Sequence, residues 1–254
     1  MSFDQYWILV LLALSRSIAF IFFLPFFRNQ GFPNMAKVAL SLGIAMFAAH
    51  KMPKVEVDDV WTMLGLIALE VIIGLILAYT VELMVSVVRV AGSYIDIDIG
   101  FSTPFMDMNQ TQTTIISSLF YYIFVLVFLV TDGFNQVFAG FLYTFKFDVS
   151  HQFLLGGDLL SFVLDTFTYM FFGALQIALP FMVATFLVNL ALLLMSKYVD
   201  KLNILTNVFG IKILVGLTLI FVAVPTILVV FQQLDDNLIE KYFESMKYMF
   251  ERKS

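Results

Sequence analysis

Several ionisable residues lie inside apolar stretches of this sequence. The fold must therefore place their charges in a surrounding that tolerates them. The richest group is Glu70, Glu82, Arg89, Asp96 and Asp98. An ionisable side chain at membrane depth costs at least about 2.5 kcal/mol, so each one needs a partner or a wet cavity. Three roles fit such residues: buried structural pairs or charges near helix ends, a proton relay in a transporter, and pairing between the subunits of an assembly.

The spacing of three of these charges indicates where their partners lie. Glu82, Arg89 and Asp96 follow one another at intervals of seven residues, which places them on one face of a helix. Two helical turns rise about 10.5 Å, whereas ion pairs along one helix need intervals of three or four residues. The sequence therefore predicts that these charges are satisfied by other helices or by other subunits.

Lys212 stands at the start of the last apolar segment, between Ile211 and Ile213. A lysine in such a place commonly extends its charge to the membrane surface. The alternative is that it pairs with a carboxylate of a neighbouring subunit and fixes how this part of the chain docks.

Patterns typical of enzymes and metal sites are weak. The chain has no Cys, which excludes a cysteine nucleophile and a Cys-ligated metal. His50 and His151 lack the spacing of metal ligands, so no metal or other cofactor is expected. The order Asp132-Gly133 does not match the Gly-Asp motif of intramembrane aspartyl proteases, and no Gly-x-Ser-x-Gly is present. We expect a protein that is not an enzyme.

The composition is that of a chain covered by lipid or by a large partner surface. Of its 254 residues, 61% are apolar and 13% are charged, against about 45–50% and about 25% in typical soluble domains. So few charges could not cover a soluble fold of this size. The net charge of −5, without a basic stripe, argues against nucleic acid as a partner.

Six apolar segments predict an all-helical membrane protein. A helix needs about 20 residues to span a bilayer, so the second segment is short and the third and fifth are over-long. The Lys and Arg residues are divided almost equally between the two sides, so the positive-inside rule gives no orientation. Either the chain is inserted with unusual help, or some of these helices do not cross a bilayer in their final state. The segments are 6–27, 35–50, 61–88, 113–130, 167–195 and 211–231.

A segment after Gly100 has two interpretations, a plug of an opening or a simple loop outside the membrane. Pro104 interrupts any helix, and the amides of residues 109–114 would lack partners in lipid. Non-helical backbone at membrane depth is tolerated only inside protein or along a cavity. Large Phe and Met side chains can fill an opening that has no fixed shape. The plug would use Phe101, Pro104, Phe105, Met106 and Met108.

Two further stretches are more polar than the apolar segments. Residues 145–165 predict a re-entrant or amphipathic excursion. Residues 234–254 carry charges together with large apolar side chains at helical spacing, which predicts an amphipathic helix at a water interface.

Short motifs in a fixed order resemble those of the flagellar biosynthesis protein FliR family and its counterpart in virulence-type injectisomes, both components of the type III secretion export gate. The order and spacing of the motifs cover about residues 10–230. The motifs are Leu24-Pro25-Phe26-Phe27, Glu70-x-x-x-Gly74, Gly92-x-x-x-Asp96-x-x-x-Gly100-Phe101 with Asp107, Asp132-Gly133, Pro180, Val188-Asn189-Leu190-Ala191, Leu202-Asn203-Ile204 and Ile211-Lys212-Ile213.

The resemblance implies a fold and a set of partners. It implies one export-gate domain over residues 1–254, present as one copy and assembled with several copies of FliP and FliQ into a closed helical cone raised out of the bilayer. Within it, residues 1–165 would be FliP-like with a plug loop at about 101–112, residues 166–233 a FliQ-like hairpin, and residues 234–254 the amphipathic tail.

The resemblance also implies a function, that of a non-enzymatic channel subunit for unfolded export substrates. Such a protein lies in the bacterial inner membrane at the flagellar basal body, and homologues of FlhB and FlhA are expected as further partners. The alternative that the residues leave open is a stand-alone secondary transporter or ion channel that uses the intramembrane carboxylates.

Overall fold

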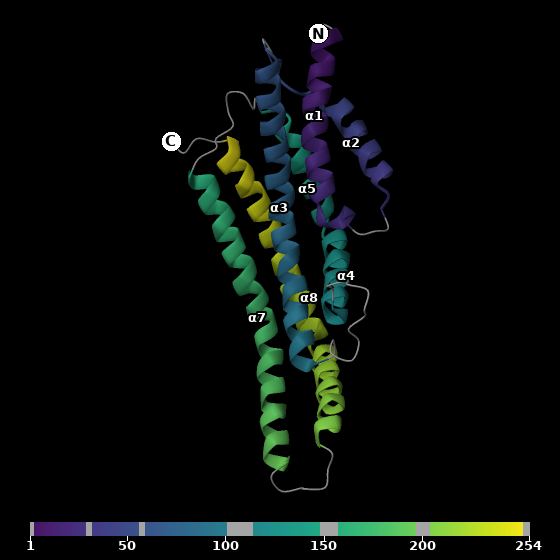
Figure 1. Ribbon diagram of the computed structural model, residues 1–254, viewed down its shortest axis with the longest axis vertical. Helices are drawn as coiled ribbons and strands as arrows, with labels where there is room; N and C mark the ends of the chain where they lie inside the picture. Colours follow the sequence, from purple (N-terminus) through teal and green to yellow (C-terminus); the bar gives the residue numbers. More distant parts are fainter. Residues whose placement is uncertain are drawn as a thin grey trace. The chain divides into compact units, whose positions relative to one another are not determined.

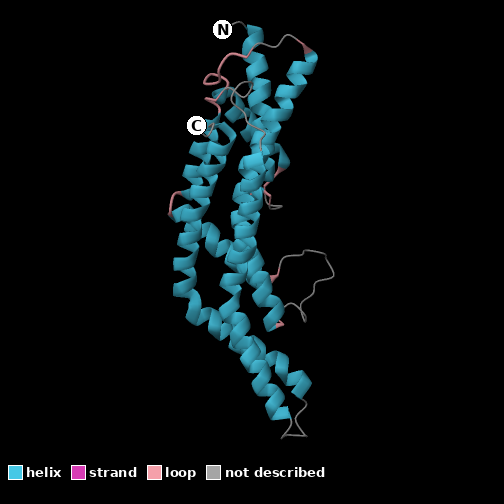
Figure 2. Ribbon diagram, turned by 90° about the vertical axis from the view of Figure 1, so that its left-hand side faces the viewer, coloured by secondary structure: helices cyan, strands magenta, loops and turns pink. Residues whose placement is uncertain are grey.

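A computed structural model of the chain describes residues 3–28, 32–55, 59–100, 114–147, 157–196 and 204–250. Within these residues every regular element is a helix, which confirms the predicted all-helical class (Figure 2). The elements are α1 (Phe3–Phe23), η1 (Pro25–Phe27), α2 (Asn34–Ala48), α3 (Val60–Ile99), α4 (Ile115–Val130), α5 (Gly133–Thr144), α7 (Gly157–Ser196) and α8 (Ile204–Phe250) (Figure 1).

The described residues include four or five membrane-spanning helices. Four helices, α1, α3, α7 and α8, are each long and apolar enough to cross a bilayer. The fifth span arises if α4 and α5, which are separated by a short break, are counted together. The helix α2 has 15 residues and is too short for the same test. The uneven segment lengths read from the sequence are therefore real.

Three helices are longer than the sequence predicts. The predicted third segment ends at residue 88, but α3 continues to Ile99; the predicted fifth begins at 167, but α7 begins at Gly157. The helix α8 runs without interruption to Phe250, so the described part of the predicted tail belongs to it. Hydropathy falls at these points, but buried side chains such as Ile95 of α3, Phe162 of α7 and Leu238 of α8 still pack against other residues, and packing sustains a helix where hydropathy does not.

The excursion predicted for residues 145–165 is partly wrong, because the part from Gly157 onward forms the first turns of α7. The helix α5 was not predicted from the sequence, although its buried Val137 and Phe141 lie four residues apart, at helical spacing. The predicted end of the fourth segment at residue 130 is correct, because α4 ends at Val130. Asp132 adopts a left-handed backbone, with φ of 60°, a conformation that Asp tolerates better than most residues.

The chain divides into two compact units, and each has its own core. Unit one comprises Met1–Met84, Asp132–Phe167 and Asp236–Ser254, and unit two comprises Val85–Thr131 and Thr168–Asp235. In unit one, α1 and α2 lie side by side (Figure 1), and the ring of Phe20 stacks on that of Phe141, with centroids 4.0 Å apart. In unit two, Phe231 of α8 contacts Phe120 and Phe124 of α4 edge-on.

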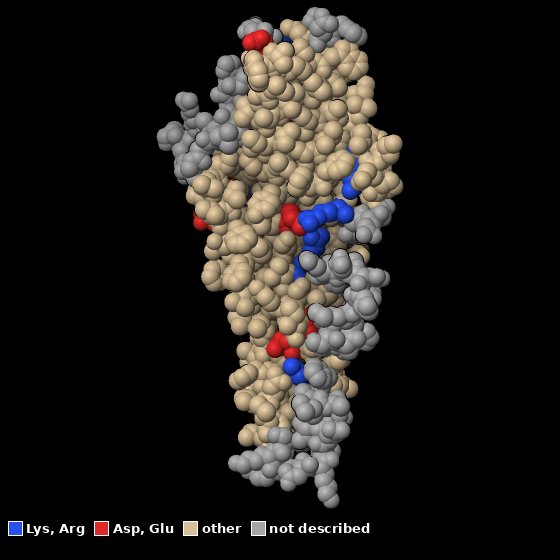
Figure 3. Space-filling view, viewed as in Figure 1, with Lys and Arg blue, Asp and Glu red and all other residues tan. Residues whose placement is uncertain are grey.

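The described surface is largely apolar. Large side chains such as Val130, Phe221 and Leu214 point outward, and Phe221 is 79% exposed. Figure 3 shows one face on which charged atoms are few and widely surrounded by uncharged ones. Such a surface needs lipid or protein against it.

Candidate functional site: polar and glycine contacts along α3

The first contact of α3 is a buried ion pair with α1 in unit one. The Arg16 Nε lies 2.5 Å from the Glu70 Oε2, and both side chains are almost wholly inaccessible. The Arg16 Nη1 also donates a hydrogen bond to the Thr144 Oγ1 of α5, at 3.0 Å. The Arg16 guanidinium carbon lies 4.5 Å from the centroid of the Phe145 ring. The buried Arg16 guanidinium therefore contacts a carboxylate, a hydroxyl group and the face of an aromatic ring.

Sequence reasoning singled out Glu70 but passed over Arg16 as its partner. A signal for it was present, because an arginine within the apolar segment 6–27 also needs a partner at membrane depth. Pairing the Arg16 guanidinium of one apolar segment with the Glu70 carboxylate of another gives each charge the partner that it needs.

Gly74 lies one turn after Glu70 and brings the backbones of α3 and α1 together. A Cβ atom at Gly74 would lie 2.5 Å from the backbone oxygen of Arg16 and 3.0 Å from the Cβ of Ala19. No side chain larger than hydrogen fits there unless the helices move apart. Glu70 and Gly74 thus act on the same turn of α1, one by charge and the other by close approach; we call Arg16, Glu70 and Gly74 the α1 clamp.

A second contact of α3, in unit two, holds the start of α4. The buried Asp96 accepts a hydrogen bond from the backbone N–H of Ile116, with 3.0 Å between the Oδ2 and the nitrogen. A Cβ atom at Gly92 would lie 2.5 Å from the Cα of Ser117. The Ser117 hydroxyl donates to the backbone oxygen of Arg89, at 2.9 Å. We call Gly92, Asp96, Ile116 and Ser117 the α4 clamp.

Arg89 also reaches α4 through its side chain. Its guanidinium carbon lies 4.3 Å from the centroid of the Tyr121 ring. A guanidinium over an aromatic face is attracted by the electron-rich ring. Of the three charges at intervals of seven, Arg89 and Asp96 thus both contact α4 within unit two.

Glu82, the third of these charges, lies near a more accessible partner in unit one. The Arg28 Nη1 is 3.3 Å from the Glu82 Oε1, and the Arg28 side chain is 66% exposed. A pair this accessible to solvent contributes little to stability. Pairing of Glu82, Arg89 or Asp96 with another subunit stays a prediction.

Asp98 and Lys212 lie in the same part of unit two. The Thr185 hydroxyl of α7 donates a hydrogen bond to the Asp98 Oδ2, and the positive charge of Lys212 on α8 acts on the same carboxylate. Gly216, one turn after Lys212, lies so close to α3 that an added Cβ would overlap the side chain of Ile99. Asp98 therefore joins the end of α3 to α7 and α8.

The predicted plug residues Phe101, Pro104, Phe105, Met106 and Met108 lie outside the described residues. Among the residues that are described, no group of three or more His, Cys, Asp or Glu side chains could hold a metal ion. The polar contacts of α3 described above join it to α1, α4, α7 and α8.

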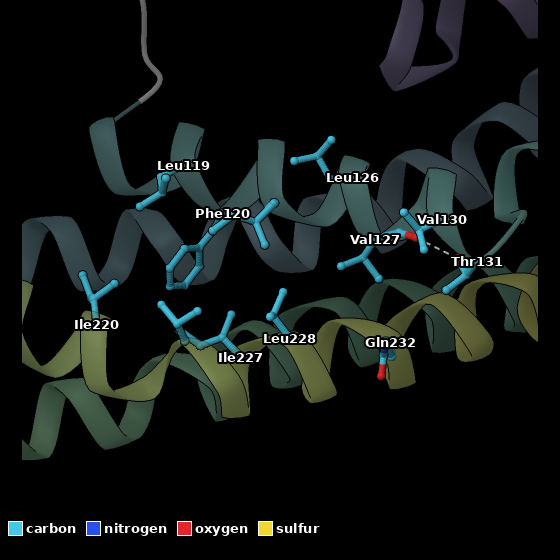
Figure 4. A pocket seen from close by; sticks show the side chains of 12 residues that line it. Leu119, Phe120, Leu126, Val127, Val130, Thr131, Ile220, Ile227, Leu228 and Gln232 are labelled. Atoms are coloured by element: carbon cyan, nitrogen blue, oxygen red, sulfur yellow. Dashed lines mark hydrogen bonds between the residues drawn. The ribbon is translucent and has the colours of Figure 1, made fainter.

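An apolar cavity lies between α4 and α8 in unit two. It has a volume of about 370 Å³, and Figure 4 shows aliphatic side chains and the ring of Phe120 around it, with Thr131 and Gln232 toward one end. Such a lining suits an apolar group. The lining residues are Leu119, Phe120, Ile123, Leu126, Val127, Val130, Thr131, Ile220, Val224, Ile227, Leu228 and Gln232.

Comparison with known proteins identifies the family. The family described as bacterial export proteins, family 1, matches residues 7–238. A protein named flagellar biosynthetic protein FliR from Bacillus subtilis (strain 168) is 28% identical over 238 residues, which cover 91% of each chain. Its namesake from Borreliella burgdorferi is 26% identical over 226 residues, 86% of this chain and 83% of the relative.

A third relative with the same name, from Escherichia coli (strain K12), is 25% identical over 222 residues, which cover 84% of this chain and 83% of the relative. The family match over residues 7–238 includes the residues of both clamps of α3. The resemblance to FliR that the motifs indicated is confirmed, and the chain belongs to the bacterial export proteins of family 1.

Proposed function

We propose that this chain is a non-enzymatic subunit of the flagellar type III export gate and that it forms, with homologues of FliP and FliQ, the channel for unfolded export substrates. The observation that carries the proposal is the match to a family of export proteins over residues 7–238, with relatives named FliR that align over most of their length. Energy for export comes from other components of the apparatus.

The helix lengths support an assembly that is not confined to a bilayer. The helices α3 and α7 have 40 residues each and α8 has 47. At about 1.5 Å per residue such helices are roughly 60–70 Å long, about twice the thickness of the hydrocarbon core. In a helical cone raised out of the bilayer, the parts that leave the lipid are covered by neighbouring subunits.

The exposed apolar surface supports the proposal that helices of partner subunits cover this chain. Long helices that leave the lipid while exposing side chains such as Leu193, Leu214 and Phe221 would be poorly soluble without protein against them. Copies of FliP and FliQ supply that cover in the proposed cone, and homologues of FlhB and FlhA dock on the finished gate. The assembly belongs to the bacterial inner membrane at the flagellar basal body.

The proposed division of the chain follows the same assembly. Residues 1–165 take the place of a FliP-like subunit, residues 166–233 that of a FliQ-like hairpin, and residues 234–254 form the tail. In this arrangement one chain completes a ring of FliP and FliQ subunits, because one part of the chain takes the place of FliP and another part takes the place of FliQ.

The segment around Phe101, Pro104, Phe105, Met106 and Met108 is proposed to plug the closed channel. An open pore would leak ions, and bulky apolar side chains exclude water and so block them. The support is the sequence alone. Deleting residues 104–110 should raise ion conductance of the assembled complex in planar bilayers while its subunits still associate. Wild-type conductance of a deletion complex that still assembles would return the segment to the simple-loop interpretation.

Deletion of the gene in its own bacterium tests the proposed function. We expect loss of flagellar filaments and of secreted flagellar proteins, with restoration by a plasmid copy; immunoblots of the medium measure the secreted protein. Normal secretion in the deletion strain would overturn the proposal. If the chain were instead a stand-alone transporter, the purified protein would move a small solute in proteoliposomes without any partner.

A further inference from the structure

The start of α4 is capped twice, once by its own chain and once from α3. The first N–H groups of any helix lack partners within that helix. At α4 the Thr114 Oγ1 accepts from the N–H of Ser117, at 3.4 Å, as an N-cap residue does. The N–H of Ile116 is satisfied by Asp96 of α3, at 3.0 Å. Asp96 is therefore a capping residue of a helix other than its own.

This position also stabilises the charge of Asp96. The N-terminus of a helix carries about half a positive elementary charge, which attracts a carboxylate. Asp96 is wholly buried, with 0% of its surface exposed. Within unit two, α4 thus compensates part of this buried charge through the Asp96 Oδ2, while the Oδ1 has no hydrogen-bond partner among the described residues.

Gly92 and Arg89 hold the same end of α4 by contacts with the backbone. The close approach of Gly92 to the Cα of Ser117 and the hydrogen bond from Ser117 to the Arg89 oxygen lie on the same face of α3 as Asp96, because residues three and four apart are neighbours on a helix. Three residues on one face of α3, at intervals of three and four, therefore meet one turn of α4.

We propose that Asp96 is a positioning residue that docks the start of α4 on α3 through its capping oxygen, and that this docking is what the assembled export gate requires of Asp96. An ion pair with another subunit is not needed. The part of this inference that concerns the gate rests on the proposed function; the part that concerns docking does not.

The test compares two substitutions of Asp96, one that removes only its charge and one that also removes its hydrogen-bond acceptor. Asp96→Asn keeps an oxygen that accepts from Ile116 and removes the charge, whereas Asp96→Ala removes both. Gly92→Ala tests the close approach, and Gly65→Ala is its matched control, because Gly65 lies on the same helix with nothing within 4 Å of an added Cβ. Each variant is purified in detergent from cells that also express the FliP and FliQ homologues.

Two quantities are measured for each variant, the midpoint of thermal unfolding and the yield of the two co-purified homologues. We expect Asp96→Ala to lower the midpoint by about 1–8 °C, the effect of a lost cap in a chain of this size, and to reduce the yield of partners. Asp96→Asn should retain the midpoint and most of the yield. Gly92→Ala should resemble Asp96→Ala, and Gly65→Ala should resemble the wild type.

Three results would overturn the inference. If Asp96→Asn loses partners as fully as Asp96→Ala while its midpoint is kept, the charge acts between subunits. If both variants unfold at the same lowered midpoint, the capping oxygen is not what holds α4. If Asp96→Ala behaves as the wild type, the contact has no role. Failure of the wild type to retain any partner would instead contradict the proposed function, and the order of the midpoints would still decide the docking.

Discussion

The Arg16 guanidinium and the Glu70 carboxylate form an ion pair of 2.5 Å that is buried between α1 and α3. Neither charge has access to water, and the Arg16 Nη1 is also engaged by the Thr144 Oγ1. Each partner is therefore the main reason that the other can be buried. The pair makes the packing of unit one depend on both residues at once.

Removal of either partner of this pair should be strongly destabilising. Arg16→Ala leaves the carboxylate of Glu70 buried without its cation, and breaking such a pair from one side costs about 3–5 kcal/mol. The double variant Arg16→Met with Glu70→Leu removes both charges and should recover most of this loss. Thermal or denaturant unfolding in detergent measures each free energy of unfolding.

The matched control is the ion pair of Lys241 and Glu244 in α8, whose side chains are 30% and 35% exposed. Lys241→Ala should change the free energy of unfolding by less than about 1 kcal/mol, since accessible pairs contribute little. Equal effects of Arg16→Ala and Lys241→Ala would show that burial does not determine the importance of the Arg16 pair.

Gly74→Ala should separate α1 from α3. The added methyl group would meet the backbone oxygen of Arg16 at 2.5 Å, and backbone cannot turn aside as a side chain does. Overpacking of this kind costs about 1–3 kcal/mol. Gly43→Ala in α2 is the control, because nothing lies within 4 Å of its added Cβ. Limited proteolysis and thermal unfolding compare the two; a Gly74→Ala protein as stable as Gly43→Ala would contradict the close contact.

Lys212→Met should have a mild effect. The charge of Lys212 acts on Asp98, but the Thr185 hydroxyl also donates to that carboxylate, so Asp98 keeps one partner. We expect a loss of about 0–1 kcal/mol in the free energy of unfolding, with co-purified partners at the wild-type level. A stable Lys212→Met protein that no longer binds its partners would instead assign Lys212 to a carboxylate of a neighbouring subunit.

Phe231→Ala should destabilise unit two, whereas Phe221→Ala should not. The Phe231 ring has 0% of its surface exposed and lies 5.7 Å from that of Phe120, centroid to centroid. Replacing a buried Phe by Ala costs about 3–5 kcal/mol. Phe221, on the same helix, is 79% exposed, so its replacement should change the unfolding midpoint of the isolated chain very little. Similar midpoints for the two variants would contradict the described packing of α8 on α4.

Much of the fold could be predicted from the sequence, because apolar segments and turn residues are local signals. The helical class and the end of the fourth segment at residue 130 follow from them. The ends of α3, α7 and α8 could not be predicted so well, since a hydropathy window detects where a helix leaves an apolar environment and not where it ends. The short α5 was missed because its 12 residues are fewer than a membrane span requires.

Along α3, the charged residues could be predicted from the sequence, whereas their contacts could not. The charges Glu70 and Asp96 were recognisable because ionisable groups in apolar segments need partners. The partners themselves were not. The partner of Asp96 is the backbone N–H of Ile116, and a backbone group leaves no trace in residue types. The roles of Gly74 and Gly92 depend on distances between helices, which the sequence does not contain.

In the proposed function, this chain works as one subunit of a hetero-oligomeric export gate. The most direct measurement is affinity purification of the tagged chain from membranes that contain its FliP and FliQ homologues, followed by native mass determination of the product. We predict a stable complex that contains both homologues and more than one copy of at least one of them. Recovery of the chain without either homologue, under conditions in which those homologues are expressed and extracted, would contradict the claim.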